Sequence, residues 1–211
     1  DDAQELISNV KTYILEELNP AYQELATFLR EEYLPQSRAG IGIKEVPNGR
    51  EWYEYLARYH TTTDLTPDEI HEIGLQEVAR IRFEMEDVMD SVAWEGDFRS
   101  FLEFLRTDPQ FYYETGEELL DAYRAMSKKI DAYMPTLFNK LPRAPYGVIP
   151  IPMESAPFTT TAYYNAPSAG RPGYFYANLY KPETRPKYEI PVLTVHEAVP
   201  GHHHQISLAQ E

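Results

Sequence analysis

A proline and a glycine interrupt the segment that gathers four of the chain's six histidines, residues 196–204. This segment opens with His196-Glu197, and three consecutive histidines follow Pro200-Gly201. Within a helix, the proline ring would clash with the carbonyl of His196 four residues back, and proline has no N–H to donate to that carbonyl. Gly201 can adopt backbone angles that other residues resist. The sequence therefore predicts a helix that is broken at this dipeptide.

The His-Glu pair indicates a zinc site, but the spacing between its histidines is unusual. In a His-Glu-x-x-His helix the second histidine lies about 400° around the axis and roughly 6 Å along it, so both rings reach one ion. Here that position is Pro200. On a straight helix, His202 would point about 120° away from His196, and His203 would lie roughly 10 Å further along. With Zn–N bonds of about 2.1 Å, neither shares an ion with His196 unless the helix is broken.

The length of the break decides which histidine is the second ligand. A loop of two residues brings His202 to the required position, and a loop of three brings His203 there. We favour His196 and His202 as zinc ligands, with His203 as the alternative. Glu197 would then face the bound water as the general base, as in zinc hydrolases.

The competing interpretation is a surface cluster of solvated imidazoles. A purification tag does not fit, because three consecutive histidines are followed by an ordinary sequence, residues 205–209. The chain also contains a second pair, His71-Glu72, with Leu75 at the i+4 position and no other histidine nearby. We expect that pair to be ordinary helix surface.

Composition excludes several classes of partner. The chain has 211 residues and is 43% hydrophobic, enough for a real core. Its net charge of −15 argues against nucleic acid or an anionic membrane surface as a partner, because binding to either requires a basic patch on the protein surface. The chain has no cysteine, so any zinc must be held by histidine and carboxylate. No apolar run reaches membrane-spanning length, so no membrane insertion is expected.

Residues up to about 140 predict helices. Helical periodicity covers residues 4–33, with a break expected at Asn19-Pro20, and shorter helices are expected at 50–58 and 98–106. Capping boxes that begin at Thr66 and Thr115 open two further helices. The helix after Thr66 carries apolar residues at helical spacing, which we expect to face a core: Ile70, Ile73, Val78, Ile81, Met85 and Val88 or Met89.

The residue composition changes after residue 140. β-Branched and aromatic runs at 147–151, 159–164 and 173–178 predict short strands, which prolines confine to edges or strand ends. We therefore expect a mainly α fold with a small β element. A helical region, 1–140, would precede strands and the start of the metal-binding helix, 141–211, in one continuous structural unit.

The last strand is a candidate for substrate binding. An edge strand beside a metal helix can pair its free N–H and C=O groups with an extended peptide. We expect residues 173–180 to form such an edge, with Asn178 and Tyr176 as substrate-binding residues. The alternative is a hairpin that only covers the helical core.

The run His196-Glu197-Ala-Val-Pro200-Gly201-His202-His203 resembles the signature of the family called domain of unknown function 885, grouped with the gluzincin-type zinc metallopeptidases. Residues 61–75 and 173–178 resemble two other stretches of that family. The resemblance implies a helical metallopeptidase-like fold, a zinc cofactor and hydrolysis of peptide bonds. The expected substrate is a peptide or small amide. Alternatives are a zinc hydrolase of other amides or esters and a non-catalytic helical binding module.

The resemblance also implies an incomplete portion of a larger domain. Members of such families are much longer, and a glutamate from a later helix normally completes the zinc site. Within this chain, the backbone would have to fold back for Glu211 to act as the third zinc ligand. We therefore expect the 211 residues alone to bind zinc weakly or not at all and to hydrolyse nothing. Exposed apolar surface would favour association with the remainder of the same protein or with a second copy.

Overall fold

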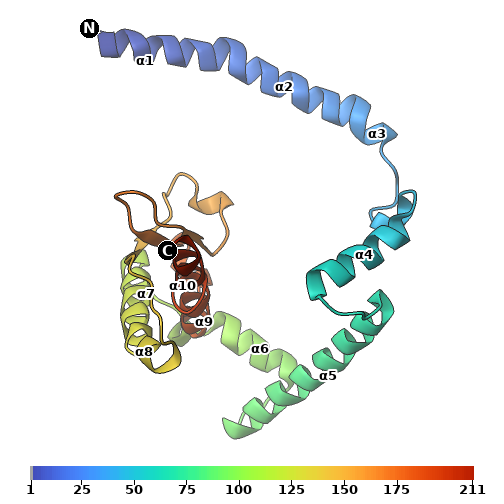
Figure 1. Cartoon of the computed structure of the whole chain (residues 1–211), viewed down its shortest axis with the longest axis vertical. Helices are drawn as coiled ribbons and strands as arrows, with labels where there is room; N and C mark the ends of the chain where they lie inside the picture. Colours follow the sequence, from blue (N-terminus) through green and yellow to red (C-terminus); the bar gives the residue numbers. More distant parts are fainter. Residues whose placement is uncertain (1) are drawn as a thin grey trace. The chain divides into compact units, whose positions relative to one another are not determined.

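The computed structural model describes residues 2–211 and is mainly helical, with one small sheet (Figure 1). It divides into two compact units, of which the first ends at Phe83 and the second spans Glu84–Glu211. The boundary falls within helix α5, Pro67–Ser91. Helices do precede strands, as expected, because the first strand begins at Tyr146. The expected division into residues 1–140 and 141–211 within one continuous structural unit stays a prediction.

The first unit begins with a continuous helical segment. It consists of α1 (Asp2–Tyr13), a π-helical turn (Ile14–Leu18), α2 (Asn19–Phe28), a second π-helical turn (Leu29–Tyr33) and α3 (Leu34–Gln36). The break expected at Asn19-Pro20 is therefore absent. Each π-helical turn contains the residue four positions before a proline, Pro20 or Pro35. A widened turn accommodates a ring that would clash there in a regular α-helix.

Helices α4 (Gly49–Thr61) and α5 follow (Figure 1). The predicted capping box of α5 is present, because Thr66 N donates to Glu69 Oε2 over 2.8 Å and Glu69 N donates to Thr66 Oγ1 over 3.3 Å. The expected burial of α5 is wrong for most of its apolar face. Val78 is 67% exposed, whereas Met89 is 8% exposed. The pattern predicts the helix, but within residues 2–211 little packs against it.

The second unit contains α6 (Phe98–Thr107), α7 (Gly116–Asp131), α8 (Met134–Leu137), α9 (Ile190–Glu197) and α10 (His202–Gln210). The capping box predicted at Thr115 is present, with Glu118 as its partner. Short 3-10 turns lie at 43–45, 109–111, 156–158, 182–184 and 187–189. Within residues 2–211, no helix is both long and apolar enough to cross a membrane.

The sheet has three strands, β1 (Tyr146–Pro150), β2 (Ala162–Asn165) and β3 (Gly173–Ala177). Their spatial order is β1-β3-β2, with β1 parallel and β2 antiparallel to β3. The prediction that the last strand is an edge is therefore wrong. Both sides of β3 are already paired, so its backbone is not available to an added peptide. The edges of the sheet belong to β1 and β2.

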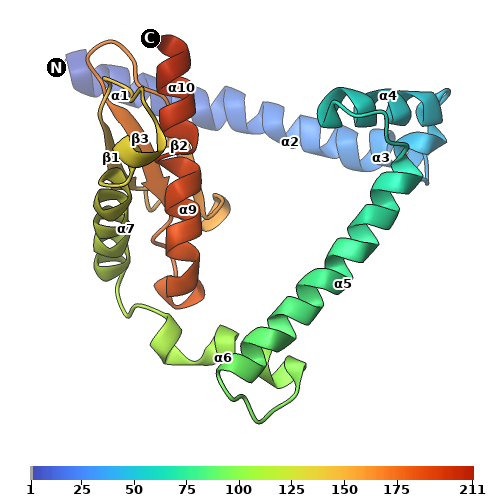
Figure 2. The same cartoon turned by 60° about the horizontal axis from the view of Figure 1, so that its bottom comes forward.

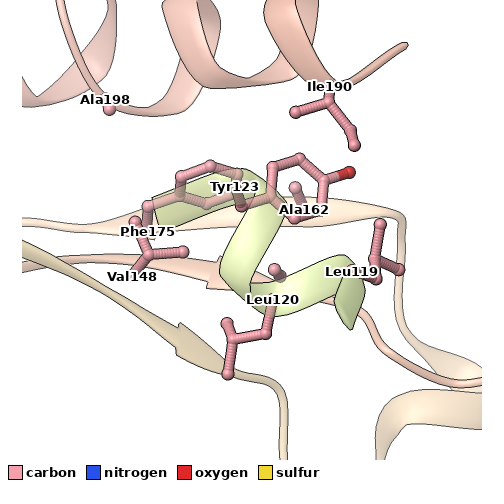
Figure 3. Close-up of a cluster of buried hydrophobic side chains, with 9 residues drawn as sticks. Leu119, Leu120, Tyr123, Val148, Ala162, Phe175, Ile190 and Ala198 are labelled. Carbon is pink, nitrogen blue, oxygen red and sulfur yellow. The ribbon is translucent and has the colours of Figure 1, made fainter. Parts of the chain in front are cut away.

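One face of the sheet packs against α7 and α9 (Figure 2). Figure 3 shows the rings of Tyr123, from α7, and Phe175, from β3, lying between the sheet and the α9 region, where Ile190 and Ala198 are drawn. The two rings meet edge to face with centroids 5.2 Å apart. Ala198 directly follows α9, so this core fixes the helix that carries His196.

Candidate metal centre

The helix that carries the histidines is broken where the sequence predicts. α9 ends at Glu197 and α10 begins at His202, and the two helices follow one another end to end (Figure 2). The turn between them contains Pro200, whose peptide bond to Val199 is cis. The break changes the direction in which α10 presents its side chains, so that regular helix spacing no longer applies.

The turn leaves no space for a side chain at position 201, so glycine is needed there. The φ of −73° and ψ of −131° of Gly201 lie outside both the helical and the extended regions of backbone angles. A Cβ at this position would also overlap the carbonyl oxygens of His196 and Val195. The unusual backbone angles predicted from the sequence are therefore present, and close approach of the backbone to the last turn of α9 is a second reason for glycine at this position.

The turn brings together three side chains that could hold a metal ion: His196, Glu197 and His202. One ligand atom from each lies within 4.8 Å of the other two. The imidazoles of the two histidines are nearly perpendicular, with centroids 4.8 Å apart. Two atoms that share a zinc ion at about 2.1 Å lie roughly 3.4 Å apart at the tetrahedral angle. Small side-chain rotations would close the remaining gap.

Glu197 is the buried member of this cluster, which we call the His-Glu-His cluster. Its residue exposure is 6%, and its Oε2 lies 4.0 Å from His202 Nε2. Burial raises the pKa of the Glu197 carboxyl, and nearby His196 and His202 partly oppose that rise. Among the described residues, Oε2 has no hydrogen-bond partner.

These features fit a bound cation. A buried carboxylate oxygen without a partner is costly unless a proton or a positive charge compensates it. Two imidazoles and a carboxylate are ligands that zinc accepts, and the chain has no cysteine to offer instead. The arrangement is therefore a candidate metal site.

His203, the alternative ligand, points away from the cluster. It is 2% exposed, and both ring nitrogens are engaged. Nε2 lies 3.0 Å from the carbonyl oxygen of Ala144, and Nδ1 lies 2.8 Å from Tyr164 Oη and 3.2 Å from Ser207 Oγ. No nitrogen is left to bind an ion in this arrangement.

The remaining candidates at the end of the chain have other contacts. His204 is buried against the ring of Phe138, with centroids 4.4 Å apart. The Glu211 carboxylate accepts hydrogen bonds from the backbone N–H groups of Arg143 and Ala144 and pairs with the Arg143 guanidinium at 3.0 Å. Glu211 is thus bound to the loop before β1 and does not join the His-Glu-His cluster.

Comparison with known proteins agrees with the sequence motif. The family model described as "Bacterial protein of unknown function (DUF885)" matches residues 1–211. The chain belongs to this family. A crystal structure of "the putative lipoprotein from Colwellia psychrerythraea" matches it with a TM-score of 0.86 and 31% sequence identity. The match covers 97% of this chain and 36% of that one, so the chain spans about a third of the length of this solved relative. None of the curated proteins matches the chain.

In this DUF885 chain, the two expected substrate-binding residues lie away from the His-Glu-His cluster. The ring of Tyr176 stacks on that of Tyr163, with centroids 4.7 Å apart. Both alternate with the inward-facing residues of their strands, so they lie on the sheet face opposite the helices. The strand alternation therefore separates Tyr176 from the cluster.

Asn178 is a structural residue. Its side chain is 1% exposed and donates from Nδ2 to the carbonyl oxygens of Ala156, Thr159 and Thr160. Its Oδ1 accepts a hydrogen bond from Tyr180 N over 3.0 Å. With its amide buried and hydrogen-bonded through both Nδ2 and Oδ1, Asn178 holds the loop after β1, and its predicted role in substrate binding stays a prediction.

Replacing Asn178 with alanine should therefore lower the free energy of unfolding by about 2 kcal/mol, because a buried amide and its hydrogen bonds to three carbonyl groups are lost. Chemical denaturation measures this change. Asn165→Ala is the matched control, since Asn165 is exposed at the end of β2 and should cost less than about 0.5 kcal/mol. Equal effects of the two substitutions would contradict the structural role of Asn178.

Sequence analysis misses Tyr164, which contacts both His202 and His203. Its ring lies parallel to the His202 imidazole, with an interplanar angle of 11° and centroids 6.3 Å apart. The residue is one of 17 tyrosines in a chain rich in aromatic residues. Only the pairing of β2 with β3 reveals that it faces the helices, so no local signal could have identified it.

Proposed function

We propose that the His-Glu-His cluster is the zinc-binding part of a hydrolase active site and that the reaction is hydrolysis of a peptide bond. The observation that carries this proposal is the buried, unpartnered Oε2 of Glu197 beside two imidazoles. The motif resemblance to gluzincin-type metallopeptidases supports the same chemistry. A peptide or small amide is accordingly the proposed substrate.

Each residue of the cluster has a separate role in this proposal. The imidazoles of His196 and His202 would hold the ion. Bound zinc would supply a polarised carbonyl and a water with a pKa lowered toward about 7. The Glu197 carboxylate accepts the proton of the attacking water and delivers it to the leaving amine. Burial makes this carboxylate a stronger proton acceptor, because it raises the pKa of the group.

Catalytic zinc usually has three protein ligands and a water. If Glu197 serves as the base, His196 and His202 supply two of them. We propose that the third is a carboxylate contributed by the full-length protein outside the His-Glu-His cluster. Functional experiments should therefore use the protein expressed at its full natural length.

Zinc content and peptide hydrolysis, measured together, test the proposal. The protein should bind one zinc ion per site, lose hydrolysis of a mixed peptide library on chelation, and regain it when zinc is added back. His202→Ala should weaken zinc binding by on the order of 100-fold or more. Loss of a residue that only supports a ligand lowers metal affinity by roughly 10- to 100-fold, and loss of a direct ligand should lower it further. Isothermal titration calorimetry measures this loss.

His71→Ala is the matched control, because His71 also precedes a glutamate but is exposed on α5. It should leave zinc affinity and hydrolysis unchanged. Hydrolysis that persists in the chelated protein would exclude the proposed reaction. Zinc binding without hydrolysis of peptides or other amides and esters would instead support a non-catalytic binding module.

A further inference from the structure

The second histidine of the His-Glu-His cluster has little to hold it locally. The side chain of His202 is 43% exposed, and among the described residues it makes no side-chain hydrogen bond. It belongs to the first turn of α10, whose N-cap residue, Gly201, has no side chain with which to cap it. The position of its imidazole therefore depends on how α10 itself is placed.

The turn before α10 contributes few backbone hydrogen bonds to the placement of that helix. Regular helix hydrogen bonds stop at the end of α9, and one backbone bond reaches from α10 to that end, His203 N to Ala198 O at 3.0 Å. Backbone hydrogen bonding across the turn therefore restrains α10 at one point. Side chains that connect α10 to the sheet add to this restraint.

His203 makes such a connection in the first turn of α10, and the Glu211 carboxylate makes another at the C-terminal end of the helix. The Ala144 carbonyl can only accept a hydrogen bond, so Nε2 of His203 carries the proton. Nδ1 is then an acceptor with one lone pair, and the Tyr164 hydroxyl, the nearer of its two neighbours at 2.8 Å, donates to it, while Ser207 Oγ lies 3.2 Å away. The buried imidazole thus links α10 to the loop before β1 and to β2.

Tyr164 contacts both consecutive histidines. Its hydroxyl donates to His203 Nδ1 over 2.8 Å, and its ring lies parallel to the His202 imidazole. Gly173 on the neighbouring strand leaves room for this contact, because a Cβ there would overlap the Tyr164 hydroxyl and lie 2.9 Å from His203 Nδ1. The absence of a side chain at Gly173 therefore gives the Tyr164 hydroxyl access to His203.

We infer that Tyr164 is a positioning residue of the metal site: its hydrogen bond to His203 fixes the first turn of α10, and with it the imidazole of His202. This inference rests on the proposed function, since it requires His202 to be a metal ligand. Tyr164 acts through other side chains and need not contact the ion. Outer contacts of this kind are worth roughly 10- to 100-fold in metal affinity.

Tyr164→Phe tests the inference, because it keeps the ring and removes only the hydroxyl. In the full-length protein, zinc affinity should fall by about tenfold. The visible absorption spectrum of the Co²⁺-loaded protein should also change in intensity and band position, since it reports the geometry of the ligands. Tyr163→Phe is the matched control, because Tyr163 is the preceding residue of β2 but faces the other side of the sheet. It should match the wild type in both measurements.

Asn178→Ala separates positioning from general loss of stability. This variant should be easier to unfold, yet its Co²⁺ spectrum should equal that of the wild type, because Asn178 bonds only to residues remote from the His-Glu-His cluster. A Tyr164→Phe protein with wild-type affinity and spectrum would overturn the inference and leave the proposed function standing. A spectrum altered as much by Asn178→Ala would overturn it too. A wild-type protein that binds neither Zn²⁺ nor Co²⁺ would overturn both proposals.

Discussion

Replacing Gly201 with alanine is expected to lower the free energy of unfolding by about 3 kcal/mol, at the upper end of the usual cost of overpacking. The added Cβ would overlap the carbonyl oxygens of His196 and Val195. These are backbone atoms in the last turn of α9, so no flexible side chain can move aside. To relieve the overlap, the turn must open and carry His202 away from His196. Zinc affinity should therefore fall by on the order of 100-fold or more, beyond the effect of an outer contact.

Gly74→Ala is the matched control for this substitution. Gly74 lies in α5, and a Cβ added there would meet no atom within 4 Å. Alanine favours a helix over glycine by roughly 0.5–1 kcal/mol, so this variant should be slightly more stable than the wild type and bind zinc equally well. Chemical denaturation and calorimetric zinc titration of both variants measure these effects. A stable Gly201→Ala protein with wild-type zinc affinity would refute the close approach at the turn.

Glu197→Gln is expected to reduce kcat for peptide hydrolysis by about 1,000-fold, within the range of 10²–10⁴ that general acid–base catalysis contributes. The amide keeps the size of the side chain but cannot accept the proton of the attacking water. Zinc should still bind, because His196 and His202 are intact. The measurement is kcat of the zinc-loaded full-length protein, with zinc content determined on the same sample.

Glu72→Gln provides the comparison for that experiment. Glu72 also follows a histidine, but it is exposed on α5, and its loss should leave kcat unchanged. If Glu197→Gln hydrolyses peptides at the wild-type rate, Glu197 is not the base. If instead zinc is lost together with activity, Glu197 is a ligand and another group must accept the proton.

Local features of the structure follow directly from the sequence. Both capping boxes form at the predicted residues, Thr66 and Thr115, because a cap involves only residues three apart. The three predicted strands form within a few residues of the expected ranges. The helix is broken at Pro200-Gly201, because proline cannot continue the hydrogen bonding of α9.

Features that depend on contacts between residues far apart in the sequence are harder to predict from the sequence. The periodicity of α5 predicts a helix correctly but not how much of its apolar face is covered, since coverage depends on what packs there. Tyr176 and Asn178 lie in the expected strand region, but neither joins the His-Glu-His cluster. Strand order decides which residues face the helices, and a sequence period of two does not state which strand is central.

The sequence by itself determined that His196 and Glu197 lie at the end of a helix broken by Pro200 and Gly201, because proline chemistry acts within four residues. The tertiary structure decided which later histidine joins them. His202 and His203 are adjacent and chemically identical, and only the contacts of His203 with Ala144, Tyr164 and Ser207 distinguish them. Those partners come from the loop before β1, from β2 and from α10, so their meeting depends on sheet pairing and on the packing of α10 against the sheet, which no local pattern encodes.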